Sequence, residues 1–228
     1  MVGLWIATVV SRLLWPLLPQ KVLRDSLSAL FAQTKDLLAG ALNREKVLTQ
    51  LTNLPVEAMG AVSQIQIAGC SEEERTNLLF LIHRSQALVS RVRQLVCRRP
   101  VLRNGSTEFA EVLGEGGNLL PEITEQILDP HFARLEFEFR QMLDAFTDCF
   151  RDGNCSREFP TIRGALTGMD QAVQQIRDRN LLGDLPSEAS LQFLDVIDRY
   201  HATADSLEEC GRLIRSLRIE RYCGDYGL

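Results

Sequence analysis

Apolar residues recur at three- and four-residue steps through most of this chain, the spacing of amphipathic helices, and no stretch shows a convincing strand pattern. A helix with a continuous apolar stripe has to bury it against other helices. Leucine and alanine abound while aromatic residues make up only 7%, which also favours helices. The sequence therefore predicts an all-α fold, a bundle of long helices. The longest stripe lies within residues 21–50: Val22, Leu23, Leu27, Leu30, Phe31, Leu37, Leu38, Leu42 and Leu48.

Proline and polar residues divide the first half of the chain into predicted helices. The stripe predicts one long helix over residues 21–50, broken at Pro55 and followed by a short helix over 56–67. Ser71, with Glu74 three residues later, is a capping box. It predicts a helix that runs to about residue 97 and is ended by Pro100.

Four further helices are predicted in the second half, separated by glycine, proline and polar turn signals. The domain organisation that follows is a helical bundle over residues 20–220, preceded by a distinct segment over 1–19 and followed by a frayed tail over 221–228. The four predicted helices cover residues 121–127, 131–150, 161–180 and 187–219.

The opening segment is apolar and carries no charge before Arg12. A spanning helix needs about 20 apolar residues, so residues 1–18 fall just short of a full crossing. We interpret the segment as the cytoplasmic half of a last transmembrane helix whose companions lie upstream, in the cell inner membrane, with the bulk of the chain cytoplasmic. The alternative is an N-terminal helix buried in a soluble core. The predicted membrane-interface residues are the aromatic and basic ones that suit such a boundary: Trp5, Arg12, Trp15, Lys21 and Arg24.

Charge and cysteine content exclude some functions. The net charge of −5 argues against nucleic-acid binding. The six cysteines are irregularly spaced and form no C-x-x-C pair, which favours scattered thiols in a reducing compartment over a disulfide framework. They are Cys70, Cys97, Cys149, Cys155, Cys210 and Cys223.

Arginines gather in one predicted helix. Residues 75–107 hold seven arginines and no acidic residue, whereas residues 108–158 hold twelve acidic residues and four arginines. The basic helix is a candidate for facing anions or anionic lipid. The interpretation we favour is that it packs beside the acidic helix and the charges match. The candidate residues are Arg91, Arg98, Arg99 and Arg103.

No pattern in the chain predicts catalysis, and we expect no enzyme, cofactor or metal site. The three histidines, at positions 83, 131 and 201, lie far apart and lack the i, i+4 spacing of ligands on a single helix. Ligands that converge from distant helices are a minor alternative. Glu136 and Glu138 lie on different helix faces and do not form a facing pair.

The exit from the apolar segment resembles a known family. Leu14-Trp15-Pro16, followed by basic residues and a Leu/Ala-rich helix, resembles the end of the membrane half of fusaric acid resistance proteins, the aromatic acid exporter family. The matching residues are Leu14, Trp15, Pro16, Lys21, Arg24, the stretch Leu27–Phe31, Leu37 and Leu38.

The resemblance covers residues 1–45 and implies several membrane helices followed by a cytosolic helical domain in an exporter of organic acids. The chain would then support assembly or gating and would not transport alone, with membrane lipid and a missing membrane half as partners. The stripe over residues 21–50 would also suit a homo-oligomeric contact. The alternative function is a soluble helical interaction or scaffold module with no transport role.

Overall fold

The computed structural model describes residues 17–40, 44–65, 72–103, 124–153, 158–183 and 187–217. These residues form six α-helices and a short π-helical turn, with no strand among them, which confirms the predicted all-α bundle. The elements are α2 (Leu17–Leu38), α3 (Arg44–Gln64), α4 (Glu72–Arg103), η2 (Thr124–Leu128), α7 (Asp129–Asp152), α8 (Arg163–Asp178) and α9 (Ser187–Ser216).

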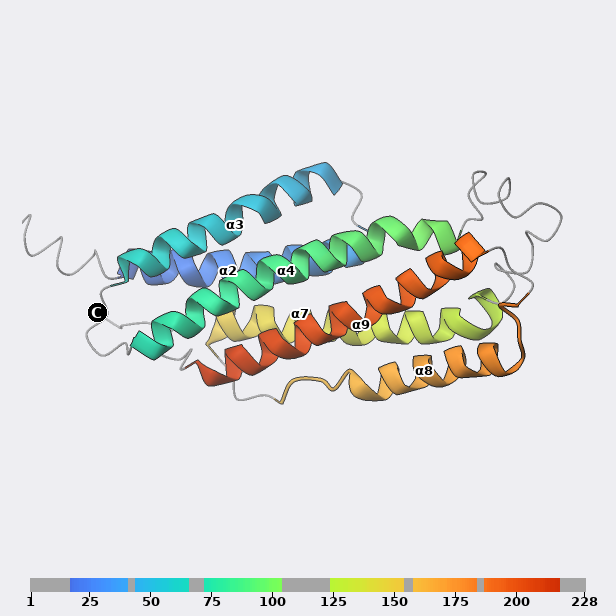
Figure 1. Cartoon of the computed structure of the whole chain (residues 1–228). Helices are drawn as coiled ribbons and strands as arrows, with labels where there is room; N and C mark the ends of the chain where they lie inside the picture. Colours follow the sequence, from blue (N-terminus) through green and yellow to red (C-terminus); the bar gives the residue numbers. More distant parts are fainter. Residues whose placement is uncertain are drawn as a thin grey trace, which may run out of the picture.

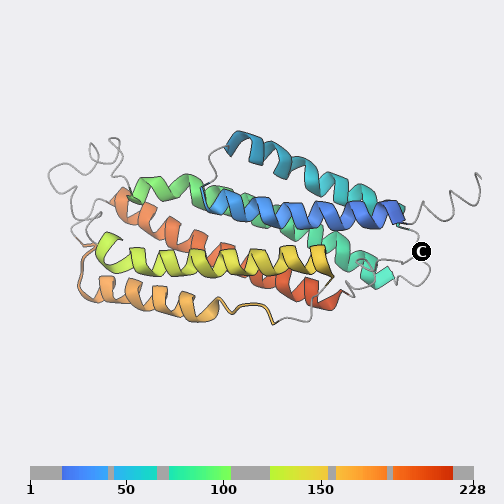
Figure 2. The same ribbon diagram turned by 180° about the vertical axis from the view of Figure 1, so that it is seen from behind.

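Four long helices form the centre of the bundle. α2 packs along α7, and α4 packs along α9, while the contacts of α2 with α4 and of α7 with α9 close the square. In Figures 1 and 2, α2 and α4 run in one direction and α7 and α9 in the other. The contacts of α2 with α7 and of α4 with α9 are therefore antiparallel, and each joins helices from opposite halves of the sequence, although the contact of α2 with α3 is more extensive than either.

Two shorter helices flank this square on opposite sides. α3 packs on α2 and α4, and α8 packs on α7 and η2 (Figure 1). Two parallel helices that follow each other in sequence need a connection that returns along the bundle. α3 provides that return between α2 and α4, and α8 provides it between α7 and α9.

The predicted helix over residues 21–50 is wrong in its length, because the chain turns at residues 39–40. The N–H of Ala39 bonds the carbonyl of Lys35 at 2.9 Å, and the N–H of Gly40 bonds that of Leu37 at 3.1 Å. Gly40 then adopts φ +83°, a left-handed conformation that glycine takes at little cost. The apolar stripe thus belongs to two antiparallel helices.

The break expected at Pro55 is also wrong, since α3 continues through this proline. A proline inside a helix removes one backbone hydrogen bond and costs about 3 kcal/mol. The buried face of α3 outweighs that cost through Leu51, Ala58, Ala61 and Val62. In the same way α4 passes Pro100, the predicted end, and continues to Arg103.

The later helices follow the predicted ranges closely. η2 and α7 are continuous, and α7 ends where Gly153 adopts φ +69° and donates its N–H to the carbonyl of Cys149 at 3.1 Å. α8 and α9 begin and end within three residues of the predicted bounds. Residues 1–16 and 218–228 lie outside the described residues, so most of the predicted segment 1–19 and all of the predicted tail 221–228 are not described.

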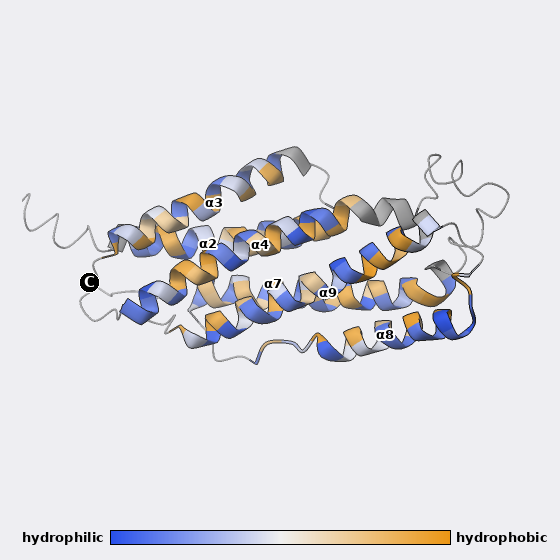
Figure 3. Cartoon of the chain, in the orientation of Figure 1, coloured by the Kyte–Doolittle hydropathy of each residue, from blue (hydrophilic) through white to orange (hydrophobic). Residues whose placement is uncertain are grey.

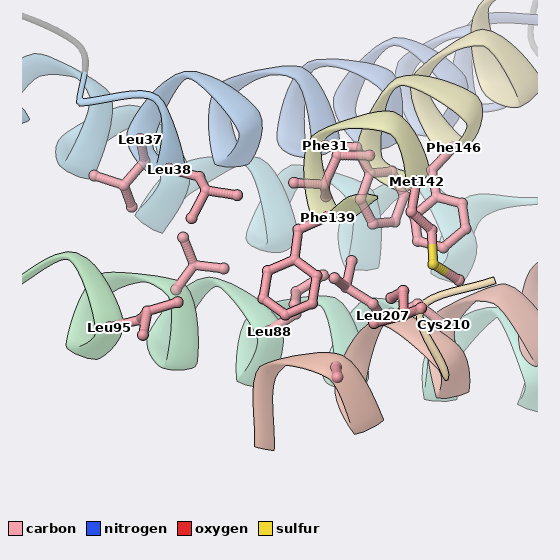
Figure 4. Close-up of a cluster of buried hydrophobic side chains, with 14 of the residues drawn as sticks. Phe31, Leu37, Leu38, Leu88, Leu95, Phe139, Met142, Phe146, Leu207 and Cys210 are labelled. Carbon is pink, nitrogen blue, oxygen red and sulfur yellow. The ribbon is translucent and has the colours of Figure 1, made fainter. Parts of the chain in front are cut away.

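The hydrophobic core lies between the four central helices. Figure 4 shows side chains from α2, α4, α7 and α9 pointing into one interior, among them Phe31, Leu88, Phe139 and Leu207. The rings of Phe31 and Phe146 meet edge to face with centroids 5.2 Å apart, a favoured aromatic geometry. Hydrophilic residues occupy most outward faces (Figure 3), so the pattern predicted from periodicity is realised in the packing.

Candidate functional site

The predicted membrane-interface residues fall at the start of α2 or before it. Trp5, Arg12 and Trp15 lie outside the described residues, whereas Lys21 and Arg24 lie in the first two turns of α2. Lys21 is exposed, and Nε of Arg24 lies 3.3 Å from Oδ1 of Asp25. No helix in the described part of the chain is both long and apolar enough to cross a bilayer.

The structure places Arg91 at the contact between α4 and α9. Its Nη1 donates to the carbonyl of Ala202 and to Oγ of Ser206, each at 2.5 Å. Arg91 is therefore a packing residue, and the expectation that it faces anions or lipid is corrected because its guanidinium is used within the bundle. Arg98, Arg99 and Arg103 lie in the last turns of α4, and their side chains are outside the described part.

One arginine of α4 pairs with an acidic residue, but on a different helix from the one predicted. Nε of Arg84 lies 3.0 Å from Oε1 of Glu209 on α9. The acidic helix α7 packs instead on α2, where Nζ of Lys35 lies 2.6 Å from Oδ1 of Asp144. Ion pairs this exposed contribute at most about 1 kcal/mol each, so they orient neighbouring helices more than they stabilise them.

A buried polar pair joins α7 to α9, and this pair was not predicted from the sequence. The hydroxyl of Tyr200 donates to Oε1 of Glu136 at 2.9 Å, and Glu136 is only 5% exposed. The ring of Phe132 stacks on that of Tyr200 with centroids 4.5 Å apart. Glu136 lies four residues after Phe132 and three before Phe139, on the apolar stripe of α7, and that spacing was the signal available in the sequence.

His201 pairs with a residue of α8, and His131 lies close to another residue of the same helix. Nε2 of His201 on α9 lies 2.8 Å from Oδ1 of Asp170 on α8, which links the flanking helix to the centre. A Cβ at Gly168 would lie 3.2 Å from Nδ1 of His131, so this glycine lets α8 approach α7 closely. Within the described ranges no three His, Cys, Asp or Glu side chains are grouped as metal ligands.

The cysteines differ in chemical state. Cys149, buried near the end of α7, belongs to a disulfide whose other half lies outside the described residues, so the prediction of scattered thiols is wrong at this position. Cys97 is an exposed thiol and Cys210 a buried one. Burial raises the pKa of the Cys210 thiol to about 12, which keeps it protonated and unreactive at neutral pH.

Two grooves open on the described surface. One, of about 360 Å³, lies on the outer side of α7, where Asp144, Asp148, Asp152 and Glu158 line it beside Phe159 and Pro160. Lys35 and Arg151 already pair with three of these carboxylates. The other, of about 420 Å³, lies between α3 and α4 and carries one charged side chain, Arg93.

These features describe a packed scaffold with two grooves and a buried polar pair that fixes how α7 meets α9. The polar side chains of Tyr200, Glu136 and His201 are used in contacts between helices. Compared with known protein families, with curated proteins and with solved structures, the chain matches none of them, so its interpretation rests on its own residues.

Proposed function

We propose that this chain is the cytosolic helical portion of an integral membrane protein of the organic acid exporter type, located at the cell inner membrane. In this role the bundle supports assembly or gating, and transport requires membrane helices beyond it. The observation that carries the proposal is the apolar segment over residues 1–18, which contains a single charged residue, Arg12, and leads directly into α2.

The length of this segment fits most of a bilayer crossing. Eighteen helical residues extend about 27 Å, against a hydrocarbon thickness of about 30 Å. Arg12 would cost about 3 kcal/mol at the bilayer centre, and less where its side chain reaches the headgroups. Lys21 and Arg24 follow on the side that the positive-inside rule assigns to the cytoplasm.

The position of α2 explains how such a segment would act on the bundle. α2 starts at Leu17, and its first turn is already packed, with Gln20 buried. Leu27 and Phe31 lie fully inside the core. A displacement transmitted to the start of α2 would therefore move a central helix of the bundle. That coupling is what a gating or assembly domain needs.

The organic acid class rests on the resemblance of residues 1–45 alone. Within that stretch Leu27, Leu30 and Phe31 are core residues of α2, so they account for folding and carry no information on a transported compound. The membrane assignment and the exporter assignment are thus separate, and the first can hold without the second.

The test is membrane flotation of the full chain beside a chain that starts at Leu17, the first residue of α2. Starting later would remove Pro19 and Gln20, which are buried in the bundle. We expect the full chain to float with lipid and resist carbonate extraction, and the shorter chain to stay soluble and helical.

A matched control is the full chain with Val9→Asp and Leu14→Asp, which keeps the length but adds two charges to the apolar segment. This variant should lose flotation while its bundle keeps the same helical content by circular dichroism. A full chain that remains soluble and monomeric without lipid would overturn the membrane assignment.

A soluble interaction module is the second candidate, and one observation favours it. Four large apolar side chains of α3 and α4 are exposed: Val56, Met59, Leu79 and Phe80. Exposed apolar side chains of this size, where they are contiguous, mark contact surfaces for other proteins. Light scattering of the chain that starts at Leu17 distinguishes a monomer from a self-associating scaffold.

A further inference from the structure

The groove between α3 and α4 has the dimensions of a small-molecule site. Its volume of about 420 Å³ falls within the range of about 300–1,000 Å³ that is typical of ligand pockets. α3 lies on the side of the bundle opposite α8 (Figures 1 and 2). The lining residues come from about two turns of each helix: Leu48, Thr49, Leu51, Thr52, Pro55, Gln86, Val89, Ser90 and Arg93.

The groove exists because α3 follows α2 more closely than it follows α4. Oγ of Ser26 on α2 donates to Oε2 of Glu57 at 3.4 Å, and the contact between α2 and α3 is the more extensive one. The side chains of α3 and α4 therefore do not close over each other between Leu48 and Pro55.

The walls are apolar with small polar groups at the edge. Leu51 and Pro55 are buried, and Leu48 and Val89 are half-buried. The hydroxyl of Thr52 is already used, since it donates to the carbonyl of Leu48 at 2.9 Å. The lining thus offers hydrophobic contact to the body of a ligand and few free hydrogen bonds to orient it.

Arg93 is the lining side chain that can orient a ligand in the groove. It is exposed, and no described residue forms an ion pair or side-chain hydrogen bond with it. Arg84 and Arg91 of the same helix are both used in contacts with α9. No carboxylate is found among the described lining residues, so the groove has a net positive charge. A guanidinium binds carboxylate, sulfonate or phosphate groups with charge-assisted hydrogen bonds.

The size of the lining selects a small molecule over a protein segment. Leu48 to Pro55 is eight residues, about 12 Å of helix. That length suits a medium-chain acyl or aryl group, whereas a docked helix is itself about 10–12 Å across and buries a much longer surface. A cation would be repelled by Arg93, and a neutral apolar compound would form no ion pair with it.

We propose that the groove between α3 and α4 binds a singly charged anionic amphiphile, whose apolar body lies on Leu48, Leu51 and Val89 and whose anionic group pairs with Arg93. The lining carries this inference without any contribution from the apolar segment 1–18, so it does not depend on membrane attachment. The site would allow such a compound to change how α3 packs against α4.

The experiment measures protection of the groove in the full chain, with the same readout in lipid nanodiscs and in buffer without lipid. Ser90→Cys places a thiol in the lining, and Cys97, exposed two turns further along α4 and outside the lining, is the internal reference. Maleimide labelling at both positions is followed by peptide mass spectrometry. We expect octanoate to slow labelling at position 90 but not at Cys97, and octanamide and octylammonium to need at least tenfold higher concentrations.

Two arginine variants distinguish binding in the groove from a nonspecific effect of the protein's positive charge. Arg93→Gln should raise the octanoate concentration for half-protection at least tenfold, whereas Arg177→Gln, which removes an equally exposed charge from α8, should leave it unchanged. Equal protection by octanamide, equal slowing at Cys97, or equal effects of the two variants would overturn the proposal. Protection at position 90 by a co-purifying protein instead of octanoate would overturn it in favour of a protein partner.

Discussion

α7 and α3 are helices of similar length, but α7 lies at the centre of the bundle and α3 lies on its flank. α7 has 24 residues and contacts α2, α8, α9 and η2, and ten of its side chains are buried. α3 has 21 residues, contacts α2 and α4, contains a proline, and leaves Val56 61% exposed. The difference shows that burial along a helix depends on how many neighbours surround it as well as on its apolar residues.

The largest effect is expected in α7. Phe139→Ala removes a fully buried ring and should lower the free energy of unfolding by about 3–5 kcal/mol. The side chain of Phe137, two residues away, is 51% exposed, so Phe137→Ala should change the free energy of unfolding by less than about 0.5 kcal/mol. Urea unfolding followed by circular dichroism measures both. Similar losses in the two variants would contradict the central position of α7.

A smaller effect is expected at the polar contact between α7 and α9. Tyr200→Phe removes the hydroxyl that donates to Glu136 and should lower the free energy of unfolding by about 1–3 kcal/mol, because a buried carboxylate oxygen loses its donor. The ring stacking on Phe132 is retained in this variant. The same urea measurement applies, and an unchanged midpoint would show that the pair does not stabilise the fold.

The smallest effect is expected in α3, with the opposite sign. Pro55→Ala restores a backbone donor inside the helix but also loses part of a buried ring, so we expect a gain of about 1 kcal/mol. Pro130→Ala is the matched control, because Pro130 lies in the first turn of α7, where no donor is missing. Thermal unfolding measures the stability of both variants. A gain in stability from Pro130→Ala but not from Pro55→Ala would contradict the expected difference between α7 and α3.

The same two regions show where reasoning from sequence succeeds. The five inward residues predicted for α7 are all buried in the structure, because they keep one helical period: Leu135, Phe139, Met142, Leu143 and Phe146. The helix over residues 21–50 was predicted too long, because Leu42 and Leu48 continue the spacing across the turn at Gly40. A period measures spacing along the chain and does not reveal a reversal of direction.

The candidate sites were less predictable than the fold. Glu136 was predicted only to lie on a different helix face from Glu138, and its donor, Tyr200, is 64 residues away in sequence. Arg91 and Arg93 are two residues apart and look alike in the sequence, but one is used in the contact with α9 and the other lines an open groove. Only the directions of α3 and α9 relative to α4 separate these two roles.

The sequence by itself determined that this chain is helical, where most of its helices lie and which faces they bury, because helical periodicity and turn residues act locally. The tertiary structure decided which helices meet. The acidic helix α7 packs on α2, and α4 finds its acidic partner in α9. The physical reason is topological: α3 and α8 return the chain along the bundle, so α2 lies against α7 and α4 lies against α9, although each pair comes from opposite halves of the sequence.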